Sequence, residues 1–222
     1  MNYKTELIKK LNNKTARVAV MGMGYVGLPF ATVFANAGFD VTGIDPIKAK
    51  METLNKGESY IMDIPTPVVS KLVENGKLRG TSDYSVLKYV DAVAICVPTP
   101  LRQTGDPDLS FIISAAEGIA PYVHAGMVVV LESSTYPGTT RELVLPTLTE
   151  KSGLKIGEDI FVAFSPERVD PGRTDWTTKN TPKVIGGITA ACTEVSAAWY
   201  SQALDRVVPV SSTEVAEMAK LL

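Results

Sequence analysis

The stretch RVAVMGMGYVGLPFATVFANAGFDVTGID, residues 17–45, decides the fold. It starts with a short apolar run that is typical of a buried strand, turns through closely spaced glycines, and continues as an Ala-rich helical pattern. The glycines stand at 22, 24 and 27, which gives the spacing G-x-G-x-x-G. A second apolar run ends on Asp45. This order predicts a strand–turn–helix unit followed by a second strand.

The spacing of the glycines has a chemical reason. Gly22 permits the tight turn out of the strand, Gly24 lets the backbone approach a pyrophosphate, and Gly27 lets the helix pack close to the sheet. The helix N-terminus then offers free N–H groups and a partial positive charge to the phosphates. A tight turn without a ligand is the alternative interpretation. The residues that we predict to bind the dinucleotide here are Gly22, Met23, Gly24, Tyr25, Val26 and Gly27.

The acid that ends the second strand predicts which dinucleotide binds. A carboxylate at Asp45 would accept hydrogen bonds from the adenosine ribose and repel a 2′-phosphate, so we expect NAD rather than NADP. Lys50, five residues later, could reach the same ribose region. A solvated lysine on a helix is the simpler interpretation of Lys50, and the sequence leaves both open.

The composition narrows the class of protein. The chain has 222 residues, 45% hydrophobic and 21% charged, with a net charge of −2. These values fit a globular domain and argue against a surface that binds nucleic acid or anionic lipid nonspecifically. The uncharged segment 18–39 contains glycines and a proline, so a buried strand–turn–helix explains it better than a membrane span.

Cysteine, histidine and the N-terminus point to the compartment. The N-terminal residues are polar and helical in pattern, without an apolar signal core. Cys96 and Cys192 offer no disulfide framework, which favours a reducing cytoplasm. His124 is expected to be exposed, and one histidine without a cluster of acids or cysteines predicts no metal site.

Strand-like and helical patterns alternate along the whole chain. This alternation predicts an α/β fold with a Rossmann-like, doubly wound, mostly parallel sheet and helices on both faces. The strands are expected at 17–22, 40–45, 91–97, 127–133, 160–165, 183–187 and 206–210. The helices are expected near 25–37, 46–56, 64–75, 108–122, 138–151 and 189–203.

The end of the chain predicts a helix that begins and does not close. Ser211 and Glu214 have the spacing of a capping box, and Val215, Met218 and Leu222 then share one face. We therefore expect an NAD-binding domain at 1–205, and a last strand plus the start of a connecting helix at 206–222. A helix cut off in mid-pattern suggests that more protein follows.

Five ordered motifs resemble a known family, from about residue 16 to the end. They are GMGYVGLP (22–29), CVPTP (96–100), ESSTYPGTT (132–140), FSPERVDPGR (164–173) and SSTEVAEMAKLL (211–222). Together they resemble the UDP-glucose/GDP-mannose dehydrogenase family. The SPERVDPGR motif is most similar to the UDP-N-acetylhexosamine branch, such as UDP-N-acetylglucosamine 6-dehydrogenase.

The resemblance implies a reaction and a larger protein. These enzymes oxidise C6 of a nucleotide sugar from alcohol to acid with two NAD, through a thioester on a cysteine. The helix that starts near Ser211 would join two Rossmann-like domains and form a homodimer interface. Neither Cys96 nor Cys192 matches the catalytic cysteine. The chain therefore resembles the N-terminal part of such an enzyme, with a UDP-sugar as substrate, and alone it is predicted to be inactive.

Glu167 is the best candidate for acid–base chemistry. It follows an apolar run, and by resemblance it is the catalytic glutamate of thioester hydrolysis. The alternative is a surface carboxylate paired with Arg168 or Arg173. Where the UDP-glucose branch has a second glutamate, this chain has Pro171. The residues that we expect to contact substrate are Glu167, Arg168, Val169 and Asp170.

The other motifs supply further candidates by resemblance. Ser134 and Thr135 would contact the nicotinamide end, with Thr135 positioning a water, although Ser and Thr also cap turns. Lys220 would stabilise the oxyanion, or pair with Glu217 on the helix surface. The residues expected to line the cofactor after the third predicted strand are Val97, Pro98 and Thr99, whereas Cys96 is expected to be buried.

Two other functions remain open at the level of sequence. A β-hydroxyacid dehydrogenase has a similar first domain, and a non-catalytic NAD-binding module needs no second domain. The SPERVDPG motif and the lysine at 220 favour the nucleotide-sugar dehydrogenase. A downstream segment with a cysteine in a Gly-rich loop would separate it from the other two.

Overall fold

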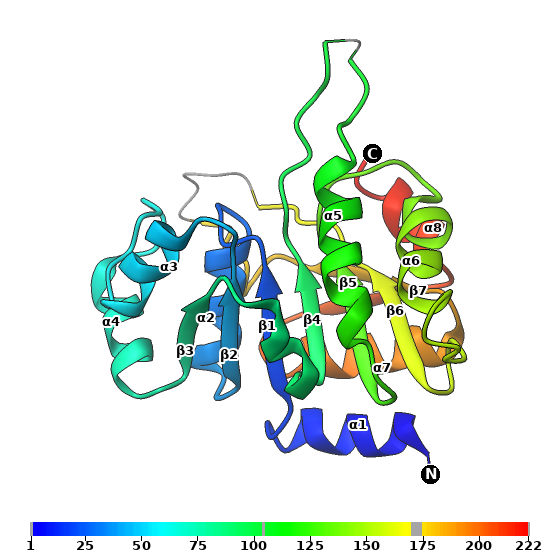
Figure 1. Ribbon diagram of the computed structural model, residues 1–222, viewed down its shortest axis with the longest axis horizontal. Coiled ribbons are helices and arrows are strands. Elements are labelled where there is room, and N and C mark those ends of the chain that lie inside the picture. The colour runs from blue at the N-terminus through cyan, green and yellow to red at the C-terminus, as the bar shows by residue number, and fades with distance from the viewer. Residues whose placement is uncertain (1, 104, 170–174, 222) are drawn as a thin grey trace.

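The computed structural model describes residues 2–103, 105–169 and 175–221. One eight-stranded sheet has helices on both faces (Figure 1). Its order is β3-β2-β1-β4-β5-β6-β7-β8, and the neighbours are parallel except for the antiparallel pair β6–β7. The strands are β1 (Arg17–Met21), β2 (Asp40–Ile44), β3 (Leu78–Thr81), β4 (Ala92–Ile95), β5 (Met127–Leu131), β6 (Ile160–Phe164), β7 (Lys183–Gly187) and β8 (Val207–Val210). The predicted doubly wound α/β fold is confirmed.

The expected helices all occur, with shorter bounds. They are α1 (Tyr3–Asn12), α2 (Gly27–Asn36), α3 (Lys48–Asn55), α4 (Thr66–Glu74), α5 (Ser110–Ile119), α6 (Leu145–Thr149), α7 (Ala190–Tyr200) and α8 (Thr213–Met218). The short turns of helix are η1 (Tyr84–Tyr89), η2 (Ala120–Tyr122) and η3 (Thr140–Val144), of which η3 is a π-helix that leads into α6. The strand β3 was not predicted, because it is an edge strand that buries only Leu78 and so lacks an apolar run.

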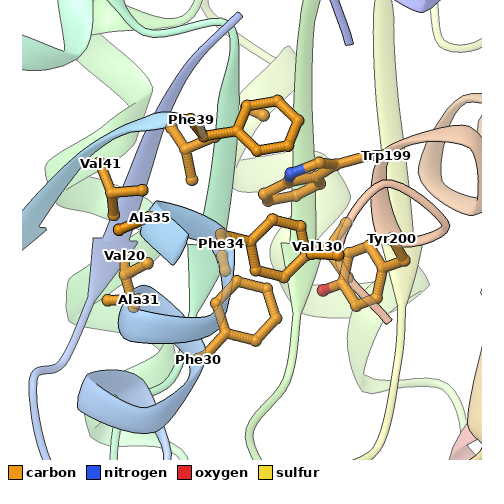
Figure 2. Close-up of a cluster of buried hydrophobic side chains, with 14 of the residues drawn as sticks. Val20, Phe30, Ala31, Phe34, Ala35, Phe39, Val41, Val130, Trp199 and Tyr200 are labelled. Carbon is orange, nitrogen blue, oxygen red and sulfur yellow. The ribbon is translucent and has the colours of Figure 1, made fainter. Parts of the chain in front are cut away.

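An aromatic cluster fixes two helices against one face of the sheet. Phe30 and Phe34 of α2 meet Trp199 and Tyr200 of α7 (Figure 2). Their ring centroids lie 4.5–6.1 Å apart, and each such pair adds about 0.5–1.5 kcal/mol beyond the area that it buries. The cluster thereby anchors the helix that follows the glycine turn.

The C-terminal helix departs from its predicted cap. The side chain of Ser212, not Ser211, accepts the N–H of Val215 at 3.3 Å, so the predicted capping box is wrong. Glu214 binds the guanidinium of Arg141 and also interacts with the side chain of Ser212. Val215 and Met218 are 45% and 47% exposed, while Leu222 lies outside the described residues.

Three smaller expectations concern the membrane, the cysteines and the histidine. Within the described ranges, no helix has the length and apolar content that a bilayer crossing requires. Cys96 and Cys192 are both buried and unpaired. His124 is part-buried rather than exposed, since its two ring nitrogens lie 3.0 and 3.1 Å from the carbonyl oxygens of Val90 and Ala125.

Candidate active site

The glycine turn between β1 and α2 has the shape of a phosphate cradle. Gly22 has φ +87°, and a Cβ there would lie 2.7 Å from the carbonyl oxygen of Cys96. A Cβ on Gly27 would lie 1.9 Å from the carbonyl oxygen of Gly22, so these positions require glycine. A Cβ on Gly24 would meet nothing within 4 Å. The first turn of α2 also has no side-chain cap, so its N–H groups and the space over Gly24 fit a phosphate.

Asp45 lies beside this cradle, directly after β2. Its side chain is 6% exposed and accepts the backbone N–H groups of Met23 and Ile47, each at 3.0 Å. The ammonium of Lys50 lies 2.7 Å from its Oδ2. Lys50 is therefore bound to the predicted ribose carboxylate, and the interpretation as a solvated lysine is wrong. The Oδ1 atom accepts from Ile47, and a carboxylate oxygen can accept two hydrogen bonds, which leaves capacity for a ribose hydroxyl.

A cavity of about 220 Å³ lies beside the cradle and Asp45. Five predicted cofactor residues line it: Gly22, Asp45, Lys50, Val97 and Pro98. Thr99 is not among the lining residues, and Tyr25 and Val26 line a different cavity beside Glu167. Sequence reasoning missed Met21, Pro46, Ile47, Tyr84, Phe111, Ser114 and Ala115. Phe111, on the first turn of α5, lines this cavity and is 44% exposed. Its large apolar side chain at the start of a predicted helix was the available signal in the sequence.

A side-chain hydrogen bond links the loop that follows β4 to the loop that follows β5. The hydroxyl of Ser133 donates to the carbonyl of Val97 at 2.7 Å. Thr135 is buried, with its Oγ1 2.5 Å from that of Thr139, whereas Ser134 is exposed. Both predicted motifs therefore meet at the carboxyl edge of the sheet, where β1 and β4 lie side by side and ligands bind in this fold.

Glu167 lies in the loop after β6 and is held by several donors. Its Oε1 accepts the N–H groups of Arg168 and Val169 at 2.7 and 2.9 Å, and its Oε2 lies 3.2 Å from the ammonium of Lys183. Burial alone would raise the pKa of Glu167, but Lys183 and the backbone donors outweigh it and hold that pKa below its usual value. The carboxylate is 12% exposed, so it is not a surface acid paired with Arg168.

The remaining residues of this loop divide into described and undescribed ones. The guanidinium of Arg168 donates to the carbonyl of Ala219 at 3.0 Å, and Val169 lines the cavity beside Glu167. Asp170, Pro171 and Arg173 lie outside the described residues.

Helix α8 brings a third group to the same place. The ammonium of Lys220 donates to the backbone carbonyl of Glu167 at 2.6 Å. Glu217 is fully buried and binds the N–H groups of Gly138 and Thr140 at 2.6 and 2.9 Å, so the alternative Lys220–Glu217 surface pair does not form. Glu217 of α8 thus binds the segment after β5, and Lys220, just beyond α8, binds the loop after β6.

Four residues of this region escaped sequence reasoning: Glu132, Lys183, Tyr200 and Glu217. Lys183 is 2% exposed and lies 2.6 Å from Glu132, and the hydroxyl of Tyr200 donates to Glu132. The available signal was a charged residue adjoining a wholly apolar strand, as Glu132 adjoins β5 and Lys183 opens β7.

The fold and the cradle define a Rossmann-type dinucleotide-binding domain of a dehydrogenase. Over residues 16–204 the chain matches the model of the NAD-binding domain of the UDP-glucose/GDP-mannose dehydrogenase family. The chain belongs to this family, and NAD is the cofactor of the domain. This confirms the family and the cofactor that the motifs predict.

The similar proteins include dehydrogenases of UDP-N-acetyl sugars and related nucleotide sugars. The chain is 35% identical to UDP-N-acetyl-D-mannosamine dehydrogenase of Salmonella typhi, covering 92% of this chain and 50% of that protein. It is 33% identical to UDP-N-acetyl-D-glucosamine 6-dehydrogenase of Pseudomonas aeruginosa, covering 94% and 49%. The crystal structure of NDP-N-acetyl-D-galactosaminuronic acid dehydrogenase from Methanosarcina mazei superposes with a TM-score of 0.88 at 35% identity, covering 99% and 49%. The chain thus spans about half the length of these relatives.

Proposed function

We propose that this chain is the NAD-binding part of a nucleotide-sugar 6-dehydrogenase that oxidises the C6 alcohol of a UDP-sugar to a uronic acid with two NAD. The observation that carries the proposal is the hydrogen bond from Lys220 to the backbone carbonyl of Glu167, in the loop that follows β6. The names of the relatives support a UDP-N-acetylhexosamine as the sugar.

Each residue has a role in this proposal, and the roles of Thr135, Glu167 and Lys220 come from the family resemblance. Bound NAD accepts the hydrides. Asp45 and Lys50 hold the adenosine ribose, and the first turn of α2 holds the phosphates. Thr135 orients a water, Glu167 takes a proton from the water that cleaves a thioester, and Lys220 stabilises the oxyanion.

The thioester needs a cysteine that neither thiol of this chain supplies. Burial raises the pKa of the Cys96 thiol well above its usual value, with Glu132 adding to the shift, so that thiol stays protonated and unreactive. Cys192 belongs to the first turn of α7 and is fully buried. We therefore propose that the second half of the family's length provides the nucleophile, and that the 222-residue chain alone does not turn over sugar.

The same proposal includes the domain bounds of the chain, a dimer interface and a cellular location. Residues 1–205 form the NAD-binding domain, and 206–222 the last strand with the start of a connecting helix. The exposed apolar side chains of Val215, Met218 and Leu221 support a homodimer interface along that helix. The two unpaired cysteines support a cytoplasmic location.

A turnover assay tests the function. The natural polypeptide that contains this chain is compared with the 222-residue chain, using UDP-glucose, UDP-N-acetylglucosamine, UDP-N-acetylmannosamine and GDP-mannose at millimolar concentration. We expect the natural polypeptide to form two NADH per UDP-N-acetyl sugar, and the 222-residue chain to form none. Steady NADH production by the 222-residue chain would contradict the proposed division, and activity of neither with any sugar would contradict the function.

Glu167 has its own test in the natural polypeptide. With Glu167→Gln we expect one burst of NADH and then an accumulated covalent sugar adduct, because hydride transfer stays feasible while the thioester is not hydrolysed. Mass spectrometry of the protein detects the adduct. Turnover near the normal rate without an adduct would show that Glu167 has no part in hydrolysis.

A further inference from the structure

The structure contains a buried ammonium that no part of the proposed chemistry uses. Lys183 is the first residue of β7, and its ammonium lies 2.6 Å from Oε2 of Glu132 and 3.2 Å from Oε2 of Glu167. The side chains of Lys183 and Glu132 are 2% and 0% exposed. Transferring an ammonium from water to the protein interior costs free energy. A buried lysine therefore stays charged only where carboxylates in contact with it offset that cost.

The direction of β7 explains how Lys183 reaches this place. In a parallel strand the first residue lies at the amino edge of the sheet, far from the ligand-binding edge. β7 is antiparallel to β6, with Phe164 opposite Gly186 and Ala163 opposite Gly187. Its first residue therefore lies at the carboxyl edge, among the residues that follow β5 and β6.

The hydrogen bonds around Glu167 leave its carboxylate one orientation. One oxygen accepts the backbone donors of Arg168 and Val169, and the other accepts the ammonium of Lys183. Lys183 in turn is fixed through Glu132, whose second oxygen accepts the hydroxyl of Tyr200. Tyr200 belongs to the aromatic cluster against α2, so the network is anchored in the core (Figure 2).

We propose that Lys183 is a positioning residue, which keeps the Glu167 carboxylate charged and in a single orientation toward the cavity beside α2. The inference rests on the proposed function, in which Glu167 must accept a proton from water. Lys183 touches neither water nor sugar in this account and acts only through Glu167. Glu132 is the second carboxylate that binds Lys183, burial raises its pKa, and Tyr200 donates to its other oxygen.

The electrostatic surroundings agree with this geometry. Burial disfavours the charged form of Lys183, but Glu132 and Glu167 outweigh burial and raise its pKa, so it stays an ammonium. The other titratable groups that act on this network are Cys96, whose burial keeps it neutral, and Tyr200, whose pKa burial raises well above its usual value. Lys220 approaches from α8 and binds the carbonyl of Glu167 rather than its carboxylate.

The test is an NMR titration of the 222-residue chain, with glutamate labelled at its carboxyl carbon and the Glu167 signal identified by its loss in Glu167→Gln. In the unmodified chain we expect Glu167 to titrate below an ordinary glutamate. Lys183→Met should raise its midpoint by about 1–3 pH units, since an opposite charge in contact lowers a carboxyl pKa by that amount. Lys183→Arg, which keeps the charge, should restore a low midpoint.

Two further variants keep the test decisive. Lys179→Met removes an exposed lysine four residues away and should leave the midpoint unchanged. If Lys183→Met does not fold, Glu132→Gln combined with Lys183→Met removes both partners and supplies the same comparison, with a midpoint above that of the unmodified chain. An ordinary midpoint for Glu167 in the unmodified chain would overturn the proposal whatever the variants do.

The titration and the sugar assay fail independently. A shifted Glu167 in a protein that oxidises no nucleotide sugar would leave the role of Lys183 intact and overturn the proposed function. Sugar oxidation, together with a Glu167 midpoint that is the same in Lys183→Met as in the unmodified chain, would overturn the positioning role alone.

Discussion

At the scale of single residues, Asp45 combines a structural and a binding task. It fixes the glycine turn through the N–H of Met23 and holds Lys50, while it closes one end of the cavity beside β1. A second negative charge, such as a 2′-phosphate, would lie against this carboxylate. Lys50 would offset part of that repulsion, so in our proposal the discrimination against NADP depends on Asp45 keeping one oxygen free for the ribose.

We predict that Asp45→Ala narrows the preference for NADH over NADPH. Removal of the carboxylate eliminates the repulsion and frees Lys50 to meet a phosphate, so NADPH should gain affinity while NADH loses it. Fluorescence titrations of both nucleotides measure the ratio. Asp40→Ala, at the other end of the same strand, is the matched control and should leave the ratio unchanged. An unchanged ratio in Asp45→Ala would remove Asp45 from the ribose site.

The residues that the sequence predicts interact with partners nearby in the chain, whereas the residues that it misses interact with distant ones. Gly22, Gly27 and Asp45 act within one βα unit, so their spacing along the chain carries the information. Lys183 pairs with Glu132 across 51 positions, which only the folded sheet brings together. No spacing in the sequence could assign that partner.

At the scale of elements, α8 connects the helix start after β5 with the loop after β6. The buried Glu217 accepts two backbone N–H groups and the hydroxyl of Thr140 at 2.7 Å. A carboxylate at the first turn of η3 also satisfies N–H groups that the helix itself leaves free. The position of Lys220, just beyond the end of α8, therefore depends on a contact that Glu217 makes three residues earlier.

We predict that Glu217→Gln destabilises the chain by about 1–3 kcal/mol, because a buried amide cannot accept all three hydrogen bonds and leaves a donor unpaired. Urea denaturation measures this loss. Glu142→Gln, an exposed acid in the same segment, should change stability by less than about 0.5 kcal/mol. Equal losses of stability in the two variants would contradict the claim that the buried hydrogen bonds of Glu217 stabilise the fold.

The pair of Glu214 and Arg141 should make stability depend on acid. The hydrogen bond from Arg141 lowers the pKa of Glu214 from 4.5 to about 2. A lowered folded-state pKa stabilises above the unfolded value, and this contribution is lost as pH falls from 4.5 toward 2. The pair is partly exposed, so Glu214→Gln should lower the melting temperature at neutral pH by no more than about 3 °C.

Melting curves of the unmodified chain and Glu214→Gln at neutral pH and near pH 2 check this sign. The difference between them should shrink in acid. Glu74→Gln, whose carboxylate accepts the hydroxyl of Ser70, serves as the control. A difference that grows in acid would contradict the direction of the shift.

Element positions were predicted better than element directions. The runs 160–165 and 183–187 predicted β6 and β7, but nothing in their apolar pattern states that the two are antiparallel. β3 was missed for a different reason, since an edge strand with one buried residue has no apolar run.

In the whole molecule, the strand order reverses between β1 and β4, which lie side by side in the sheet (Figure 1). The chain carries the cradle, the ribose carboxylate and the Glu167 loop, while it spans about half the length of its relatives. Because the cradle and the cavity are built from residues 21–115 alone, cofactor binding should not depend on the other half.

The most direct measurement is a calorimetric titration of the unmodified 222-residue chain with NADH and with NADPH. We expect one site, with NADH bound at least about tenfold more tightly than NADPH, a difference of about 1.4 kcal/mol. Equal affinities, or no binding of NADH at all, would contradict the claim that this chain holds a complete NAD site whose ribose end is set by Asp45.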